Sequence, residues 1–421
     1  MTLNKQDVIV LGGGVAGIEF ITRAARKDKN KQFNFILIDK NPLHIWKPML
    51  HTFAAGSQFP SEQSIPLLTQ AKRYGYLYQP GEVNDINPLE KKITLAPYRD
   101  AQNTEILPER TLHYDYLVVA IGSKSNDFNT KGVKEFSYTI DDLPAAMRFN
   151  REFTDSIIQS AILQKKHHLV IVGAGAAGVE LSGEIINQIL TASNYSNDNF
   201  MDYIDVTIIQ ADDRVVPTFK DSISEAVKHA MEKIGIRIRL STRVSEVTKD
   251  SVILENGETL KADQVVWTAG VKAPEVLSKI KDLALSPTSQ LIVNEHFQAI
   301  DDPSIFAIGD CAYVQDSPLS TTAQAASQQA IYLGNHFFKM MIQQTNIPSF
   351  KYVDKGSLVS IGTYASFGMF GRNTIFRGLE FRGLSAKIAH ISLYRQHQMR
   401  LLGFFKGLSA WISDRFRKWS R

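Results

Sequence analysis

Short, unbroken runs of apolar residues recur along this chain, and two of them lead directly into glycine-rich segments. The run at residues 8–11 precedes Gly12–Gly17, and the run at residues 169–172 precedes Gly173–Gly178. Apolar runs of this length, bounded by turn residues, are typical of strands buried on both faces of a parallel sheet. Apolar residues at helical spacing then predict helices over about residues 15–26 and 179–190. A strand–turn–helix unit is therefore predicted twice.

Later segments extend this repeat. The runs at 33–38 and 205–210 end in Asp39 and Gln210, and the runs at 114–122 and 264–270 end in a glycine. A further apolar run at 305–308 leads to a predicted helix over about residues 322–341. The pattern predicts an α/β protein with two Rossmann-like dinucleotide-binding domains, the first of them discontinuous. The expected divisions are residues 1–125 and 281–365 for the first domain, 126–280 for the second and 366–421 for a C-terminal region.

Both glycine segments fit the pattern GxGxxG. The first glycine permits a tight turn, the second lets the backbone approach a pyrophosphate, and the third lets the helix pack closely on the strand. Two such segments predict two dinucleotides, and electron transfer between them. The nucleotide-binding residues expected here are Gly12, Gly14, Ala16, Gly17, Gly173, Gly175 and Gly178.

The residue at the end of the second strand of each unit bears on the nucleotide. Asp39 lies 22 residues beyond Gly17, where such units place a carboxylate on the ribose hydroxyls; the alternative is an acid at the surface. Gln210 is a neutral amide at the equivalent position, and it removes the repulsion of a 2′-phosphate. Asp212 could still favour NADH, whereas Arg214 could favour NADPH. We expect NADH as the main donor, with NADPH tolerated.

Composition places the reactive chemistry in bound cofactors. At 44% hydrophobic and 21% charged residues, the chain is typical of a globular protein. The single cysteine, Cys311, excludes an internal disulfide, a CxxC pair and a cysteine-rich metal site, and we expect it to be a packing residue. No metal is predicted. The short polar segment before the first strand predicts no signal peptide, and the uncharged stretch 317–338 is too polar for a membrane span.

The C-terminal segment is basic and amphipathic. Residues 377–421 contain ten Lys or Arg and two acids. The apolar residues at helical spacing are Leu401, Phe404, Phe405, Leu408, Trp411, Ile412, Phe416 and Trp419; the cations around them are Lys406, Arg415, Arg417 and Lys418. This pattern indicates a helix in a membrane interface facing anionic lipid. A helix docked on the protein's own core or on a homodimer partner is the alternative. No nucleic acid is expected, because the aromatics share the apolar face.

Four segments carry a resemblance to a known family. Residues 44–50 resemble the HLWKPLL segment of type II NADH dehydrogenases, residues 323–329 resemble their AQxAxQ signature, and residues 267–274 and 355–360 resemble two further family segments. The chain thus resembles the NADH:quinone oxidoreductases among the flavoproteins with two dinucleotide-binding domains and a glutathione-reductase-like fold. The resemblance implies non-covalent FAD and hydride transfer from NADH to FAD. It further implies electron delivery to a membrane quinone without proton pumping, on the cytoplasmic face of a bacterial inner membrane.

The resemblance also implies roles for individual residues. Asp310, with Gly309, would bind the flavin's ribityl chain, and Lys47 would place positive charge near the flavin; a surface lysine is the alternative. Glu180 would lie near the nicotinamide, although a first-turn acid can simply complement the helix dipole. The remaining expected cofactor contacts are Gly122, Gly270 and Ala323.

Quinone reduction consumes two protons, so a carboxylate near the flavin is useful. Glu184 is a candidate for this route, with a solvated helix face as its alternative. Gln324 and Gln328 share a helix face, where neutral amides suit a quinone carbonyl; alternatively they satisfy buried backbone groups. Ser327 lies beside them.

Two other functions are compatible with these patterns. The first is a soluble flavin reductase that passes electrons to an iron–sulfur or other protein carrier, which would not need the amphipathic tail. The second is a nucleotide-sensing flavoprotein, in which slow turnover with every quinone would accompany tight binding of NAD.

Overall fold

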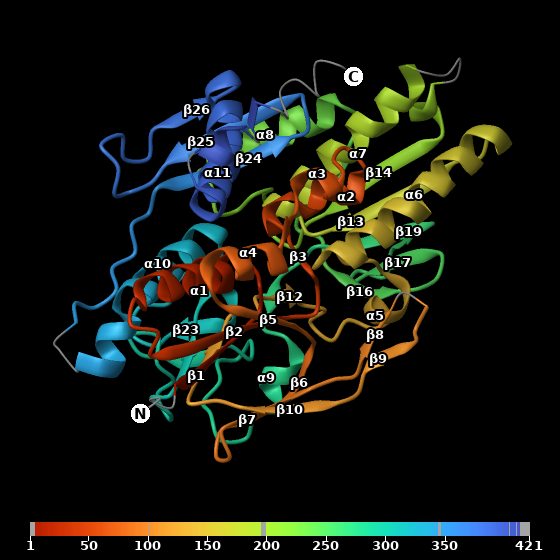
Figure 1. The fold of residues 1–421 in the computed structure, drawn as a ribbon. Helices are drawn as coiled ribbons and strands as arrows, with labels where there is room; N and C mark the ends of the chain where they lie inside the picture. The colour runs from red at the N-terminus through yellow and green to blue at the C-terminus, as the bar shows by residue number, and fades with distance from the viewer. Residues whose placement is uncertain are drawn as a thin grey trace.

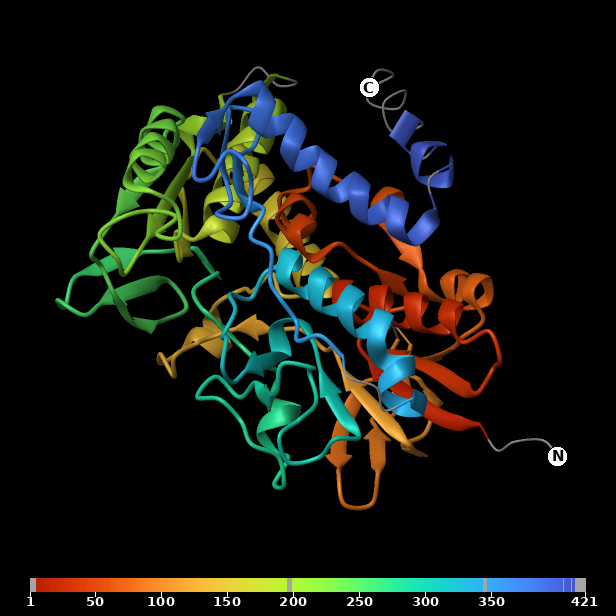
Figure 2. The same ribbon diagram turned by 90° about the vertical axis from the view of Figure 1, so that its left-hand side faces the viewer.

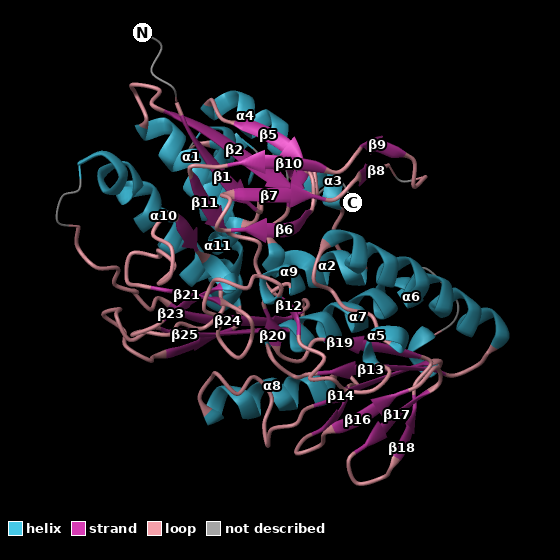
Figure 3. Ribbon diagram, turned by 90° about the horizontal axis from the view of Figure 1, so that it is seen from below, coloured by secondary structure: helices cyan, strands magenta, loops and turns pink. Residues whose placement is uncertain are grey.

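A computed structural model describes residues 5–100, 102–194, 199–343, 347–403, 405–409 and 411–412. Its framework is two parallel sheets (Figure 1). The first has the order β22 (Ile305–Ala307), β11 (Tyr116–Val119), β1 (Gln6–Leu11), β2 (Phe33–Asp39) and β5 (Leu77–Pro80). The second has the order β15 (Arg237–Arg239), β14 (Ile204–Ile209), β13 (His167–Val172) and β19 (Gln264–Trp267). Figure 3 shows the two sheets in separate halves of the molecule.

Each sheet is covered by helices that follow its strands. In the first half, α1 (Val15–Lys27) packs against α10 (Ala323–Phe338), and the two lie side by side in Figures 1 and 2. In the second half, the principal helices are α6 (Leu143–Leu163), α7 (Ala176–Asn194) and α8 (Asp221–Lys233). The central strands are almost fully buried because both faces are covered, which explains their continuous apolar runs. Cys311 is fully buried in the core of the first half.

A short helix connects the halves. α2 (Leu50–Ala55) comes from the N-terminal segment, yet Leu50, Phe53 and Ala54 belong to the hydrophobic core of the second half. α2 packs on both α6 and α7. This packing brings the segment just before it, with β3 (Leu43–His44), to the junction of the two halves.

Antiparallel sheets complete the structure. The order in one is β10 (Arg110–His113), β7 (Lys92–Leu95) and β6 (Val83–Asn87), and in another β16 (Val244–Val247), β17 (Ser251–Leu254) and β18 (Thr259–Lys261). A third contains β24 (Gly356–Ile361), β25 (Ala365–Phe370) and β26 (Glu380–Arg382), and α11 (Leu384–Leu402) packs on it. Figure 2 shows α11 passing beside α1 and α10.

Three sequence-based boundaries differ from the structure. The helix expected at 179–190 begins at Ala176, directly inside the glycine turn, and continues to Asn194. The helix expected to reach residue 341 ends as α10 at Phe338, and a π-helical turn follows. Local periodicity does not fix the ends of helices, where caps and packing decide.

The C-terminal region differs most from the expected amphipathic helix. Residues 366–402 contain β25, β26 and α11, and α11 ends before Gly403, whose φ is 79°. The apolar stripe is thus interrupted at Gly403. Leu401 is buried on α11, while Phe405, Trp411 and Ile412 are exposed on residues 405–409 and 411–412, which are helical again. Phe404, Arg415, Phe416, Arg417, Lys418 and Trp419 lie outside the described residues, so the stripe stays a prediction there.

Candidate dinucleotide and redox site

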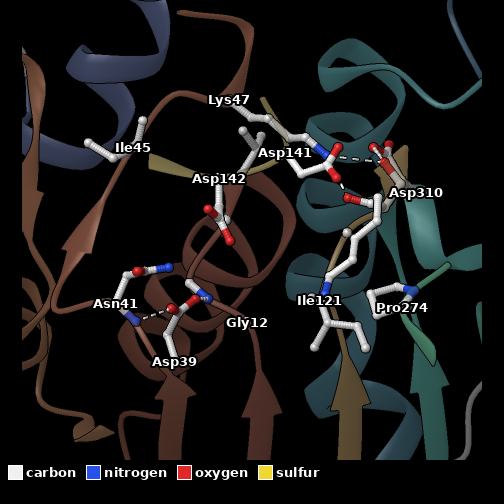
Figure 4. A pocket seen from close by; sticks show the side chains of 18 of the residues that line it. Gly12, Asp39, Asn41, Ile45, Lys47, Ile121, Asp141, Asp142, Pro274 and Asp310 are labelled. Atoms are coloured by element: carbon white, nitrogen blue, oxygen red, sulfur yellow. Dashed lines mark hydrogen bonds between the residues drawn. The ribbon is translucent and has the colours of Figure 1, made fainter. Parts of the chain in front are cut away.

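A cavity of about 810 Å³ lies where the two halves meet. Its lining comes from the first glycine loop, the carboxyl ends of β1, β2 and β11, and the first turns of α7 and α10. Figure 4 shows Asp39 at the end of its strand, and Gly12 and Ile121 just beyond the ends of theirs. Ligands of open α/β sheets bind at this edge.

The first glycine loop has the geometry expected of a phosphate cradle. Gly12 has a φ of 99°, and a Cβ there would lie 2.4 Å from the Ala120 carbonyl oxygen. A Cβ on Gly17 would lie 1.9 Å from the Gly12 oxygen, so only glycine permits this contact of helix and strand. A Cβ on Gly14 would meet nothing within 4 Å. Gly14 is also the N-cap of α1, so its open side adjoins unpaired N–H groups that suit an anion.

The second loop repeats this geometry. Gly173 has a φ of 109°, a Cβ on Gly178 would lie 1.9 Å from the Gly173 oxygen, and a Cβ on Gly175 would meet nothing within 4 Å. Ala176 and Ala177, at the start of α7, line the same cavity as the first loop. The chain thus fits two dinucleotide pyrophosphates, one at the start of α1 and one at the start of α7.

Asp39 lies at the expected position beside the first loop. Its Oδ2 accepts a hydrogen bond from the Gly13 N–H at 2.6 Å, and its Oδ1 accepts one from the Asn41 N–H at 2.7 Å (Figure 4). Burial raises the pKa of Asp39, although the two backbone hydrogen bonds oppose this. The carboxylate lines the cavity, where it fits the ribose role.

Lys47 and Asp310 are connected through Ser123 on the wall of the cavity (Figure 4). Lys47 Nζ donates to the Ser123 carbonyl oxygen at 2.7 Å and to its Oγ at 3.2 Å. Ser123 Oγ in turn donates to Asp310 Oδ2 at 2.8 Å. The loop after β22 thus places an acid, and the loop before α2 a cation, at positions that fit a flavin. Gly309, beside Asp310, is anchored because its N–H donates to Gln329 Oε1.

Glu180 lies on α7 between residues from three other segments. Its Oε1 accepts a hydrogen bond from the Ser360 N–H at 3.2 Å and lies 3.4 Å from His390 Nε2, and its Oε2 lies 3.5 Å from His51 Nδ1. Burial alone would lower the pKa of His390, but the hydrogen bond and charge of Glu180 outweigh it and raise that pKa. Glu180 lines the cavity, whereas the half-buried Glu184 does not. Of the two carboxylates, Glu180 is therefore the one placed to exchange a proton with a group bound in the cavity.

Gln324 and Gln328 bind backbone in this structure. Gln324 donates to the Gly356 carbonyl at 3.1 Å and accepts from the Lys355 N–H at 2.7 Å. Gln328 donates to the Val353 carbonyl and accepts from the Val353 N–H, both at 2.9 Å. The residues of α10 that line the cavity are instead Ala323 and Ala326. The backbone alternative describes these contacts, and a quinone role for the two amides stays a prediction.

Gln210 is buried at the end of β14. Its Oε1 accepts a hydrogen bond from the Ala174 N–H, and its Nε2 donates to Asp212 Oδ2, both at 2.7 Å. Arg214 pairs instead with Asp221. The exposed Asp212 carboxylate is thus hydrogen-bonded to the Gln210 amide, whereas Arg214 forms an ion pair with Asp221 and not with either of them.

The other predicted residues divide into two groups. Cavity-lining members are Ala16, Gly122 and Gly270. Those outside the lining are Gly17, Gly173, Gly175, Gly178 and Gln210. The second group lies mainly at the second glycine loop, so the cavity is centred on the first glycine loop.

The chain is similar in sequence to a known family of redox enzymes. Residues 6–330 match the model of the pyridine nucleotide-disulphide oxidoreductase family. A type II NADH:quinone oxidoreductase of Haemophilus influenzae is 34% identical, covering 95% of this chain and 95% of its own. This chain belongs to the type II NADH:quinone oxidoreductases. A Staphylococcus aureus member of the same name is 26% identical over 88% of this chain and 92% of its own.

Solved structures support the fold. NDH2 of Plasmodium falciparum, determined in complex with NADH, has a TM-score of 0.81 at 22% identity, covering 95% of this chain and 97% of its own. A sulfide:quinone oxidoreductase of Aquifex aeolicus has a TM-score of 0.74 at 17% identity, covering 94% and 92%. The predicted family and its fold with two dinucleotide-binding domains are confirmed. The chain has two glycine loops, at residues 12–17 and 173–178. It has a single cysteine and therefore no cysteine pair.

Sequence reasoning missed five titratable residues around the site. These are Glu19, His44, His51, His390 and His397. Two spacings could have indicated them: a glutamate follows the last glycine of each loop by two residues, and each histidine pair is seven residues apart. His390 and His397 are thus two helical turns apart on α11.

Proposed function

We propose that this NADH:quinone oxidoreductase holds FAD at the first glycine loop and NADH at the second, and passes electrons to a membrane quinone without pumping protons. The observation that carries the proposal is the pair of glycine loops with matching geometry, whose helices begin at one cavity. The bound flavin would supply the hydride acceptor, and the chain's residues orient it and exclude side reactions.

The test is steady-state NADH oxidation by the FAD-loaded protein with a soluble quinone analogue. Rapid turnover, with flavin released intact by acid precipitation, supports the enzyme and non-covalent binding. Failure of the loaded protein to reduce any quinone would favour a protein electron carrier as acceptor. Slow turnover with tight NAD binding would favour the sensor.

The roles of the chain's own residues follow from their contacts. Lys47, donating to Ser123, places a positive charge at the cavity wall that stabilises negative charge developing on a bound group. Asp310 accepts from Ser123 and faces the same space. Glu180 and His390 form a partly buried acid–base pair beside the cavity, suited to hold a proton for the quinone.

We propose NADH as the main donor, with weakened discrimination against NADPH. Gln210 carries no charge to repel a 2′-phosphate, but Asp212 remains hydrogen-bonded to it and exposed. The remaining selectivity would therefore come from Asp212.

Asp212→Asn is expected to raise kcat/KM for NADPH about tenfold relative to NADH, because it removes a negative charge that repels the 2′-phosphate. A tenfold change corresponds to about 1.4 kcal/mol. Asp213→Asn, which changes the adjacent exposed acid, is the matched control and should leave the ratio unchanged. A strong NADH preference that survives Asp212→Asn would contradict weakened discrimination.

We further propose that the enzyme is peripheral on the cytoplasmic face of a bacterial inner membrane. Within the described residues, no helix combines the length and apolarity needed to cross a bilayer. Leu384, Ile388 and Ile391 recur at helical spacing on α11 and are exposed, and the basic tail follows α11. Exposed apolar residues beside concentrated cations suit an anionic lipid surface.

Ending the chain after Leu402 is expected to reduce binding to anionic vesicles at least about tenfold, since each cation near such a surface contributes about 1 kcal/mol. NADH oxidation with a soluble quinone analogue should be unchanged, because α11 and β24–β26 remain. Vesicle co-sedimentation at low and high salt is the measurement. Unchanged sedimentation of the shortened protein would show that the tail is not the lipid contact.

A second copy of the chain is the other partner proposed for the apolar stripe. Light scattering of the full-length and shortened proteins would measure their masses in solution. A dimer that becomes a monomer on shortening would assign the tail to the homodimer, whereas equal masses would leave it to the lipid.

A further inference from the structure

A buried cluster of ionisable side chains connects α11 to the first glycine loop. Glu19 on α1, His44 on β3 and His397 on α11 are 5%, 2% and 1% exposed. His44 Nδ1 lies 2.7 Å from the Gly13 carbonyl oxygen, and the two histidine Nε2 atoms lie 2.7 Å apart. His397 Nδ1 lies 2.8 Å from Glu19 Oε1. The three side chains thus form an unbroken chain of hydrogen bonds from α1 through α11 to the loop.

Other groups face this chain from the neighbouring elements. Ser327 Oγ on α10 donates to Glu19 Oε2 at 2.7 Å. Arg400 Nη1 on α11 lies 2.6 Å from Ser327 Oγ and 3.4 Å from Glu19 Oε1. The Trp46 ring lies against His397, with centroids 4.3 Å apart. Glu19 therefore faces the Arg400 guanidinium and the His397 ring, and His397 is shielded by an aromatic ring.

The hydrogen bonds determine where the protons are. Burial raises the pKa of Glu19, but the hydrogen bonds and charges of His397, Ser327 and Arg400 bring it below its usual value. Glu19 is thus ionised and accepts a hydrogen from His397 Nδ1. The Gly13 carbonyl can only accept, so His44 Nδ1 also carries a hydrogen.

One further hydrogen must lie between the two Nε2 atoms, since two lone pairs cannot face each other at 2.7 Å. Burial is the main cause that lowers the pKa of His44 to about 3, so His44 is neutral. The hydrogen therefore belongs to His397. His397 is an imidazolium that donates to Glu19 and His44, and its charge is balanced by Glu19.

The far end of the chain determines the orientation of one peptide in the loop. The Gly13 N–H donates to Asp39, and the Gly13 carbonyl accepts from His44. With both of its polar groups bonded within the protein, Gly13 orients the next residue, Gly14, whose open side adjoins the start of α1. Among the residues that the structure describes, His44 is the one side chain that hydrogen-bonds this carbonyl.

We propose that His397 is a positioning residue for the FAD phosphate loop: its buried imidazolium holds His44 against the Gly13 carbonyl and couples FAD retention to pH and to the docking of α11. Loss of the proton leaves two lone pairs face to face, so a hydrogen bond of the chain breaks and the carbonyl loses its donor. FAD retention is therefore expected to be strongest while the hydrogen between the two Nε2 atoms is in place. The inference rests on the proposed binding of FAD at this loop.

The test measures the rate of flavin release from the FAD-loaded full-length protein between pH 6 and 9, by recovery of flavin fluorescence and without NADH or quinone. The wild-type rate is expected to rise about tenfold or more with pH, which corresponds to about 1.4 kcal/mol. His397→Leu should release FAD as fast at pH 6 as the wild type does at pH 9. Glu19→Gln should move the midpoint down by about one pH unit or more, because an opposing charge has been removed.

Tyr394→Phe is the control for docking of α11. It removes the hydroxyl that donates to the Gln63 carbonyl and accepts from Gln398 Nε2, and it leaves Glu19, His44 and His397 in place. Its pH profile should match the wild type. If His397→Leu does not fold, the midpoint of Glu19→Gln decides. A flat wild-type profile, an unmoved midpoint in Glu19→Gln, or equal effects of His397→Leu and Tyr394→Phe would each overturn the proposal. The release assay contains neither NADH nor quinone, so its result does not depend on turnover. If FAD release depends on pH as expected but the loaded protein fails to reduce quinone, only the proposed function is overturned.

Discussion

Gly14→Ala is expected to give a folded protein that has lost FAD, whereas Gly175→Ala is expected to retain FAD and lose affinity for NADH. A Cβ at either position meets no protein atom within 4 Å, and the φ of Gly14, −68°, suits alanine. The methyl group would instead occupy the space in which each loop approaches a pyrophosphate. Flavin content after purification and NADH titration of the loaded protein are the measurements, with losses of at least about tenfold, or about 1.4 kcal/mol.

Thermal unfolding without added nucleotide provides the control for both variants. The apo proteins should unfold at the wild-type temperature, because neither substitution contacts the protein. Gly17→Ala provides the contrast, since its Cβ would lie 1.9 Å from the Gly12 carbonyl oxygen and must disturb the protein itself. Loss of FAD from both Gly14→Ala and Gly175→Ala would contradict the assignment of one nucleotide to each loop.

Glu180→Gln is expected to lower kcat for quinone reduction about 100-fold while KM for NADH changes little, in the range of general acid–base catalysis. The substitution preserves shape but removes the carboxylate that lies between His51 and His390 at the cavity wall. Quinone reduction takes up two protons. Of the two predicted carboxylates, Glu180 lines the cavity and Glu184 does not. Steady-state kinetics across pH would measure the effect.

The same experiment on Glu184→Gln distinguishes the two carboxylates. Glu184 lies one turn further along α7 and does not line the cavity, so its replacement should have the smaller effect. Because Glu180 raises the pKa of His390, Glu180→Gln should also move any pH dependence due to His390 to lower pH. Unchanged kcat in Glu180→Gln with a large loss in Glu184→Gln would contradict the assignment.

The strand and glycine patterns were sufficient to predict the framework and much of the site. Continuous apolar runs mark strands buried on both faces. Gly17 and Gly178 are required by contacts within a single strand–turn–helix unit, and Gly12 and Gly173 have a positive φ at the turn of that unit. Asp39 and Asp310 follow from the same local logic, because Asp39 is the last residue of β2 and Asp310 lies three residues after β22, at the sheet edge where ligands bind. These features depend on neighbours in sequence, so sequence alone reveals them.

The C-terminal region could not be predicted in this way. Its stripe from residue 401 onward predicted one surface helix. The structure instead forms β25, which pairs with β24, and β26, which pairs with β25, ahead of that stripe, and it packs Leu401 into the core. Whether an apolar face is covered by lipid, by another chain or by the protein itself depends on what the fold brings against it. Periodicity does not contain that information.

The sequence by itself determined the family, the two dinucleotide loops and the acids at the strand ends, because each is encoded within a short segment of chain. Only the tertiary structure decided which groups act together. It placed Gln324 and Gln328 on the backbone of residues 353–356, and it brought His397 to Glu19, 378 residues away in the sequence. Such contacts arise from the packing of α11 and α10 against α1, and a buried charge is stable only where packing supplies its partner.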